Sequence, residues 1–346
     1  MTKSAVLSER DERLAKINEL KKQGIDSYPA KSNRTHKIME VLDGFADLEN
    51  SKNNLTLSGR VITKREHGNL TFANLQDDSG KIQIAISKKD IGADNYKLFG
   101  KFIDMGDFVE ITGICFTTHK GEKSIMASDF HLLAKAVRPL PEKWHGLKDE
   151  EELLRKRYLD ILLNPEVKEM VIKKAKFWQA MRTFMLNHEF IEVETPVLEV
   201  TAGGADARPF ITHHNALDID VYLRICTGEL WQKRLMVAGL EKTFEIGRQF
   251  RNEGMDAEHL QDYTQIEFYW AYADYQDGMK FVEELYKYVA QETFGTLKFK
   301  IKNFDIDLGK TWERYDYRDT VLTMTGVDIL KASEQEIRKK LDELKV

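Results

Sequence analysis

The residues best suited to chemistry lie between Lys242 and Tyr275, in two stretches where apolar and polar side chains alternate. On the apolar parity lie Phe244, Ile246, Phe250, Thr264, Ile266, Phe268 and Trp270. On the polar parity lie Glu245, Gln249, Arg251, Glu253, Tyr263, Gln265, Glu267 and Tyr269. Because successive side chains of a strand point to opposite faces, the pattern predicts a long hairpin joined by a polar loop from Asn252 to Asp262. One face of this hairpin would carry an arginine, several carboxylates and two tyrosines.

Two interpretations of this polar face stay open, because a buried arginine beside glutamates is costly unless it is paired or bound to a ligand. One is an internal ion-pair network or a dimer contact. The other is a charged-ligand site, in which Arg251 would hold a phosphate through two parallel hydrogen bonds. Glu267 and Tyr269 would then hold a cationic group, and His259 in the loop would contact a triphosphate.

Other candidate residues lie upstream. Glu229 precedes a helix-like run from Leu230 to Val237, where an N-terminal carboxylate is favoured by the helix macrodipole. The Gly-rich segment from Thr201 to Ala205 is typical of a turn. The adjacent pair His213-His214 would point to opposite faces of a strand, which is poor geometry for chelation. The sequence contains no P-loop motif, and no dinucleotide-binding glycine motif follows a strand.

The first half of the chain predicts a barrel that would carry its own binding face. Residues 8–24 predict an amphipathic helix that opens with a capping box. Five β-rich segments follow, at Leu55–Ile62, Leu70–Gln76, Lys81–Ile86, Asp107–Cys115 and Ser124–Ala134. With a helix at 88–100 after the third strand, this is the plan of an oligonucleotide-binding (OB) barrel. In the third strand Ile82, Ile84 and Ile86 should face the core, whereas Lys81, Gln83 and Ala85 should face outward.

The second half must position the hairpin. Arg138-Pro139-Leu140-Pro141 is a stiff junction, because each proline restrains its own backbone and that of the residue before it. A charged helix from Glu150 to Leu163, an apolar helix from Pro165 to His188 and a strand at Ile191–Glu194 follow. The remainder mixes strands and helices without a regular βαβ period, which favours an α+β domain with an antiparallel sheet.

Composition limits the possible binding partners and the cell compartment. The 346 residues carry a net charge of −5, yet between Lys52 and Lys89 seven basic residues face only three acids. This local excess indicates either a polyanion-binding face or a strand edge guarded by lysines. No apolar stretch is long enough to span a membrane, and Met1–Arg10 has no apolar signal core. Cys115 and Cys226 match no zinc spacing, so we expect reduced thiols in a cytoplasmic protein.

Several motifs resemble those of class II aminoacyl-tRNA synthetases. The run Phe250-Arg251-Asn252-Glu253-Gly254 resembles their second signature motif, and Phe190 to Pro196, after the apolar helix, resembles the first. The segments at 203–215 and 269–275 are similar to the lysyl-tRNA synthetases in particular, as are 138–141 and 157–160. The resemblance implies ATP-dependent activation of L-lysine to lysyl-adenylate, followed by transfer to tRNA(Lys).

The resemblance also implies roles for individual residues. Arg251 and Glu253 would be catalytic, with Arg251 at the α-phosphate and Glu253 at the adenine end of ATP. His259 would contact the terminal phosphates, and Tyr263, where the family usually has phenylalanine, would stack on the adenine. For the substrate lysine the matching positions are Gly204 and Glu229 near the α-amino group and Glu267 and Tyr269 around the side chain. The positions that match anticodon-reading residues are Arg65, Phe72, Gln83 and Glu122.

On this basis we expect a helical extension at 1–50, an OB-fold anticodon-binding domain at 51–137, a linker with a charged helix at 138–165, and an incomplete catalytic domain at 166–346. The third signature motif and the carboxylates that hold Mg²⁺ would lie beyond residue 346. The segment before Glu229 is one residue longer than in the family. A homodimer and no membrane partner are expected. The alternatives are a catalytically inactive RNA-binding protein and an aspartyl- or asparaginyl-type synthetase.

Overall fold

The computed structural model describes residues 8–141, 149–254, 256 and 258–345, in two compact units, Met1–Arg155 and Lys156–Val346. Residues 1–7 of the predicted extension and residues 142–148 of the predicted linker lie outside the described residues. Within the part that is described, no helix is both long and apolar enough to cross a membrane.

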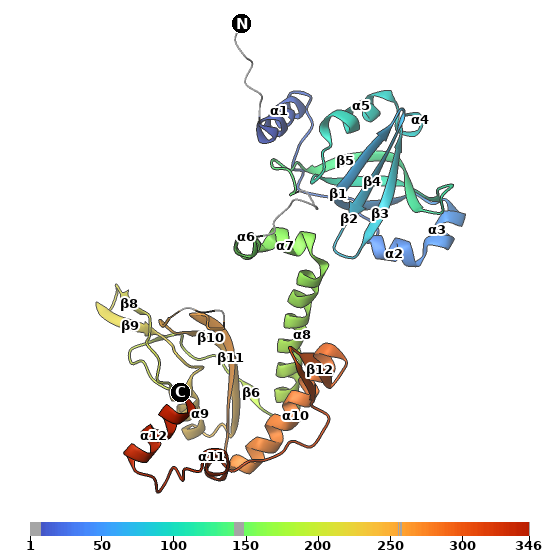
Figure 1. Ribbon diagram of the computed structural model, residues 1–346. Coiled ribbons are helices and arrows are strands. Elements are labelled where there is room, and N and C mark those ends of the chain that lie inside the picture. The colour runs from blue at the N-terminus through green and yellow to red at the C-terminus, as the bar shows by residue number, and fades with distance from the viewer. Residues whose placement is uncertain (1–7, 142–148, 255, 257, 346) are drawn as a thin grey trace. The chain divides into compact units, whose positions relative to one another are not determined.

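The first unit is a closed barrel (Figure 1) with strand order β1-β2-β3-β5-β4. Its elements are β1 (Leu55–His67), β2 (Leu70–Gln76), β3 (Lys81–Ser87), α4 (Lys88–Ile91), α5 (Ala93–Phe102), β4 (Phe108–Thr117) and β5 (Lys123–Ala134). The predicted OB barrel, with helix after the third strand, is confirmed. β1 runs beyond the predicted end at Ile62, because Thr63 to His67 continue to pair with β2 after a bulge. These residues are polar and lack the apolar alternation that predicts a strand, so this part of β1 was not expected from the sequence.

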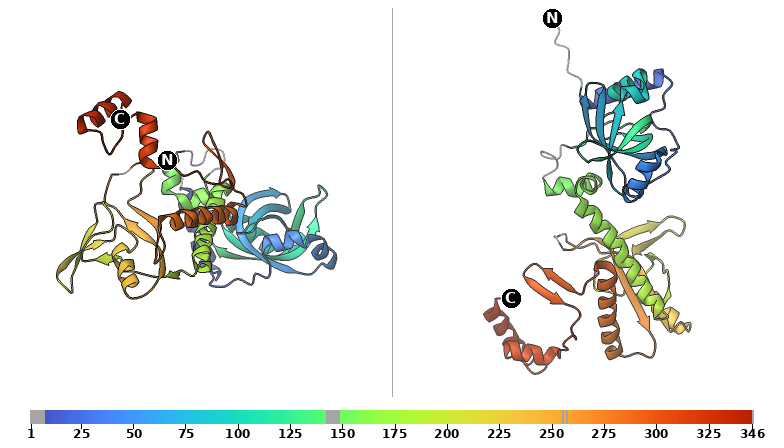
Figure 2. Two further views of the ribbon diagram at one scale, coloured as in Figure 1. Left: turned by 90° about the horizontal axis from the view of Figure 1, so that it is seen from below. Right: turned by 90° about the vertical axis from the view of Figure 1, so that its right-hand side faces the viewer.

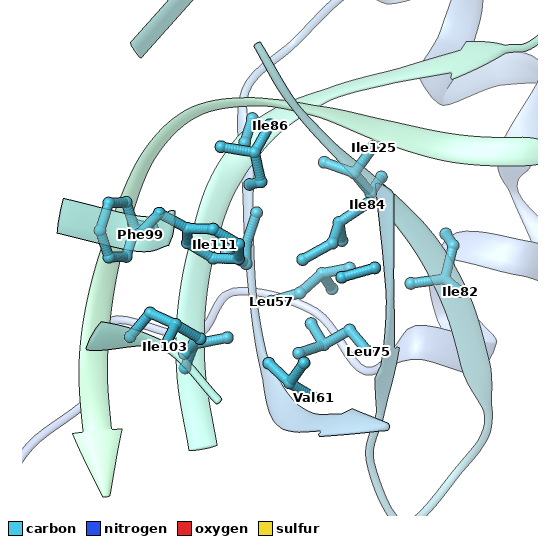
Figure 3. Close-up of a cluster of buried hydrophobic side chains, with 14 of the residues drawn as sticks. Leu57, Val61, Leu75, Ile82, Ile84, Ile86, Phe99, Ile103, Ile111 and Ile125 are labelled. Atoms are coloured by element: carbon cyan, nitrogen blue, oxygen red, sulfur yellow. The ribbon is translucent and has the colours of Figure 1, made fainter. Parts of the chain in front are cut away.

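The barrel core is built from the inward parity of each strand (Figure 3). Ile82, Ile84 and Ile86 are buried there as predicted. Ala85 lies on the outward parity as predicted, opposite Phe72, but it is fully buried. Its register partners are Phe72 on β2 and Met126 on β5, and its small side chain is covered between these larger ones.

The N-terminal helices are fastened to the barrel. They are α1 (Glu9–Lys22), α2 (Ile38–Asp43) and α3 (Phe45–Ser51), and Ser8 caps α1 as predicted. The buried Arg13 donates to the carbonyls of Met105 and Ala136, at 3.0 and 3.1 Å. Lys16 pairs with Asp104 at 2.6 Å. These bonds tie α1 both to the barrel and to the chain that leaves it.

The second unit contains two three-stranded sheets. One has the order β11-β10-β6, from β6 (Ile191–Glu192), β10 (Lys242–Phe250) and β11 (Asp262–Trp270). The other has the order β7-β9-β8, from β7 (Leu198–Glu199), β8 (Ile211–His214) and β9 (Ile219–Leu223). The remaining elements are α7 (Arg157–Leu163), α8 (Pro165–Asn187), α9 (Glu229–Val237), α10 (Tyr275–Phe294), β12 (Lys298–Ile301), β13 (Phe304–Asp307), α11 (Tyr317–Thr325) and α12 (Glu334–Leu344). The mixed α+β character is as predicted.

The core of this unit lies under the apolar parity of β10 and β11. Helices α8 and α10 lie side by side (Figures 1 and 2) and cover it with Phe184 and Phe281. Phe244 and Phe268 meet them from the strands. The predicted single charged helix at 150–163 is wrong: α6 (Glu150–Arg155) and α7 are separate, because the backbone of Lys156 leaves the helical conformation. The strands are thus held from the apolar side, and α9 and the turn before it pack against their polar side.

Candidate functional site

The predicted hairpin is confirmed, and its register defines the candidate site. Glu245 on β10 lies opposite Glu267 on β11, and Gln249 lies opposite Tyr263. Tyr269 follows on the same face, opposite Thr243. Two carboxylates therefore face each other across the strand pair, which is unfavourable unless cations or hydrogen-bond donors compensate them.

Glu245 is compensated internally. The guanidinium of Arg224, which follows β9, is almost fully buried and pairs with Glu245 Oε1. Thr195 Oγ1 donates to the other carboxylate oxygen at 2.7 Å. The ion-pair interpretation of the polar face therefore holds for Glu245. Arg224 was missed from the sequence, where its only signal is an arginine directly after a β-rich stretch.

Four residues implied for substrate lysine come together around Glu267, directly across the strand pair from Glu245. Glu229 is the first residue of α9, and Gly204 lies so close that an added Cβ would be 3.0 Å from Glu229 Oε2. Glu267 accepts a hydrogen bond from the backbone N–H of Thr227, two residues before Glu229, at 3.0 Å. The charges of both glutamates act on Tyr269. Gly228 precedes Glu229, and its left-handed backbone, at φ 67°, places Glu229 at the helix start.

The electrostatics of this cluster favour a cation. Burial raises the pKa of Glu267, and the nearby Glu229 and Glu245 raise it further. Burial, then Glu229 and Glu267, raise the pKa of Tyr269 to about 12. Lys233 pairs with Glu229 at 2.6 Å from the exposed side of α9. A bound ammonium group would reduce the repulsion among these carboxylates, which is one cause of the raised pKa values.

Gly204→Ala is expected to destabilise the fold by about 2–4 kcal/mol, since overpacking and a forced positive φ each cost about 1–3 kcal/mol. Gly204 has φ 90°, and a Cβ there would overlap Cys226 Sγ and lie 2.8 Å from Glu229 Cβ. Urea unfolding measures the change. Gly203→Ala is the matched control: its nearest neighbour is the flexible side chain of Leu230, at 3.1 Å, so the loss should be clearly smaller. Equal losses would contradict the close packing of Gly204 against the cluster.

The residues implied for ATP lie at and beyond the end of the hairpin. The guanidinium of Arg251 donates through Nε to the carbonyl of Ile225 at 3.2 Å and lies 5.7 Å from the centre of the Tyr263 ring. No carboxylate of the described residues pairs with it, so its terminal nitrogens can take an anion. Glu253 is exposed and accepts the backbone N–H of Arg208 at 3.2 Å. Thus Arg251 and Tyr263 form one group.

His259 stands apart from that group in the loop. It is exposed, and its Nδ1 lies 2.7 Å from Asp256 Oδ2. His213 on β8 lies 3.1 Å from Asp220, and its neighbour His214 accepts a backbone hydrogen bond, which agrees with structural roles for both. Among the described residues, no group of three or more potential ligands is arranged to hold a metal ion.

Three of the residues implied for anticodon reading lie on the outer parity of the barrel strands. Arg65 on β1 is exposed and is the register partner of the partly exposed Phe72 on β2. The Phe72 ring also meets the edge of His67, with centroids 6.5 Å apart. One step along the face, Gln83 donates to Ser124 at 2.9 Å, and Glu122 lies exposed just before β5. Arg65, Phe72 and Gln83 therefore lie on one face of the neighbouring strands β1, β2 and β3.

Comparison with known proteins agrees with this geometry. The family described as tRNA synthetases class II (D, K and N) matches residues 149–342, and an OB-fold nucleic acid binding domain matches residues 55–133. A lysine–tRNA ligase of Carboxydothermus hydrogenoformans is 48% identical over 316 residues, which cover 91% of this chain and 64% of that protein.

The lysine–tRNA ligase of Bacillus subtilis is 48% identical, with 90% and 63% of the two chains covered. That of Clostridium novyi is 45% identical, with 95% and 66% covered. The chain thus spans just under two thirds of the length of these relatives. From the barrel, the acidic hairpin face and the family match, the chain belongs to the class II tRNA synthetases of the D, K and N group.

Proposed function

We propose that this chain contributes to lysine–tRNA ligation, the ATP-dependent activation of L-lysine and its transfer to tRNA(Lys). The observation that carries the proposal is the cluster of Gly204, Glu229, Glu267 and Tyr269, which is acidic and partly buried. A site for aspartate would need an arginine or lysine in place of these carboxylates to neutralise the substrate side chain. The names of the relatives support the same substrate.

The first step is an in-line displacement at the α-phosphate of ATP. A carboxylate oxygen of lysine forms the new O–P bond as the bond to pyrophosphate breaks. The nucleophile is already ionised, so the protein needs to position it and stabilise charge rather than remove a proton. Arg251 would bind the α-phosphate, and Tyr263 would stack on the adenine. Glu253 would contact the adenine end of ATP, and His259 would contact its terminal phosphates. A hydroxyl of the terminal tRNA ribose then takes the lysyl group and releases AMP.

Mg²⁺ would accompany the triphosphate and shield its charge. The described residues do not form a metal site, so none of the steps above is assigned to the ion. What these residues supply is the guanidinium of Arg251, whose orientation is fixed by the carbonyl of Ile225. Glu267 and Tyr269 would bind the cationic end of the substrate.

Two macromolecular contacts belong to the proposal. Residues 51–137 would bind the tRNA anticodon through the outer barrel face defined by Arg65, Phe72, Gln83 and Glu122. A homodimer would form through α8, where Met170, Val171 and Ile172 are consecutive and each about half exposed. Three successive apolar residues point about 100° apart around a helix, and their exposure here leaves an apolar surface that a second copy would cover.

Lysine-dependent ATP–pyrophosphate exchange tests the function. It should be measured on the complete protein encoded by the gene and on residues 1–346, with lysine, aspartate and asparagine in parallel. The complete protein should exchange with lysine alone. Exchange with aspartate or asparagine instead would refute the substrate assignment. No exchange with any amino acid, together with retained tRNA binding, would point to an RNA-binding protein without ligase activity.

A further inference from the structure

Four polar side chains are fully buried behind the acidic cluster: Thr227, Gln232, Thr243 and Gln249. They come from the turn before α9, from α9 itself and from β10. None of them was selected from the sequence as a site residue. Buried polar groups are costly unless they are hydrogen-bonded, so the bonds of this group reveal what it holds in place.

Gln232 is the centre of these bonds. Its Nε2 donates to the carbonyl of Thr227 at 3.0 Å and approaches the carbonyl of Glu267 at 3.4 Å. Its Oε1 accepts from Thr243 Oγ1 at 3.0 Å. Because both carbonyls can only accept, the orientation of the amide is determined. The Gln232 side chain therefore links α9 to the turn before it and to both strands of the hairpin.

The turn is held from a second side as well. Gln249 Nε2 donates to the hydroxyl of Thr227. With its carbonyl bound by Gln232 and its hydroxyl by Gln249, Thr227 has little freedom to rotate. Its N–H points to Glu267 Oε2 at 3.0 Å, and it is the hydrogen-bond donor that the described residues supply to that carboxylate.

We propose that Gln232 is a positioning residue for recognition of the cationic substrate group. It holds the Cys226–Gly228 turn so that the Thr227 N–H stays on Glu267, which keeps this half-buried carboxylate ionised and correctly oriented. The identity of the cation as the lysine ammonium rests on the proposed function. The hydrogen bonds from Gln232 to Thr227 and from Thr227 to Glu267 do not depend on it.

The charges around Glu267 make this single donor important. Glu229 from α9 and Glu245 from β10 oppose its ionisation, whereas Lys233 from α9 favours it. Tyr269 and Cys226 also face this group, and both have raised pKa values. The Thr227 N–H lowers the pKa of Glu267 against burial and repulsion. Loss of the donor should therefore raise that pKa further.

The test is the pKa of Glu267 in residues 1–346, measured by ¹³C NMR of labelled glutamate carboxyl groups and assigned with Glu267→Gln. Gln232→Met, which keeps the length of the side chain but removes both polar atoms, should raise this pKa by about one unit, or about tenfold in the ionisation constant. Gln291→Met changes an exposed glutamine on α10 and should leave the pKa unchanged.

Thr243→Val gives an independent result if Gln232→Met does not fold. It removes the hydroxyl that donates to Gln232 Oε1, and it should shift the pKa of Glu267 in the same direction by a smaller amount. An unchanged pKa in the folded variants would overturn the inference, whatever the ligase activity proves to be.

Calorimetric titration of the complete protein with L-lysine separates this inference from the proposed function. Gln232→Met should weaken lysine binding by about tenfold, because the Thr227 N–H would no longer hold the Glu267 carboxylate in the orientation that meets the ammonium group. A shifted pKa in a protein whose unmodified form binds no lysine would refute the proposed substrate and leave the positioning role intact.

Discussion

Arg251→Lys is expected to lower the rate of lysine-dependent ATP–pyrophosphate exchange by about 10²–10³-fold in the complete protein, the usual loss when one preorganised donor to transition-state charge is removed. The substitution keeps the positive charge. It loses the planar fork, whose Nε is held by the carbonyl of Ile225 while its terminal nitrogens remain for the phosphate. The effect should fall on kcat more than on the KM for lysine, because charge develops at the α-phosphate in the transition state.

Arg248→Lys is the matched control for this experiment. Arg248 lies near the end of β10, three residues before Arg251 and on the opposite parity, is half exposed, and pairs with Asp262. The two substitutions are chemically identical, so any general effect of changing arginine to lysine in this part of the hairpin would appear in both. Exchange within about twofold of the unmodified protein is expected for Arg248→Lys. A similar rate for Arg251→Lys would show that Arg251 does not touch the reacting phosphate.

The features that could be predicted from the sequence depend on local periodicity. The alternation at 244–250 and 263–270 placed Glu245, Gln249 and Glu267 on one face, and the register pairs them there. The same period placed Ile82, Ile84 and Ile86 in the barrel core. In both cases neighbours in the chain determine burial, because a strand with one buried face must alternate.

The features that could not be predicted depend on contacts between distant segments. Arg224 and Glu245 are 21 residues apart and meet only because β9 leads to the polar face of β10. Gln232 is a polar residue in a short helix, a pattern typical of an exposed position, yet it is fully buried against the hairpin. No local pattern distinguishes it from a solvated glutamine. Residues that support a site from behind are therefore missed unless the fold is known.

Phe72→Ala is expected to weaken the binding of residues 1–346 to a tRNA(Lys) anticodon stem-loop by about 5- to 150-fold, since stacking of a base on an aromatic ring contributes about 1–3 kcal/mol. Phe72 is suited to this role because it is partly exposed on the outer barrel face opposite Arg65. An unpaired base on the ring would place its phosphate near that guanidinium. Fluorescence anisotropy at several salt concentrations gives the affinity.

The salt dependence separates stacking from charge on this face. Phe72→Ala should lower the affinity with little change in the slope of log K against log salt, whereas Arg65→Gln should reduce the slope by about one phosphate contact. Phe108→Ala is the control, because Phe108 is a partly exposed barrel aromatic that is already covered by Arg60. An affinity unaffected by Phe72→Ala would exclude stacking on this ring, and an equal loss for Phe108→Ala would place the RNA on another face. Only the combination of a large Phe72 effect and a reduced Arg65 slope locates the anticodon on the row of side chains formed by β1 and β2.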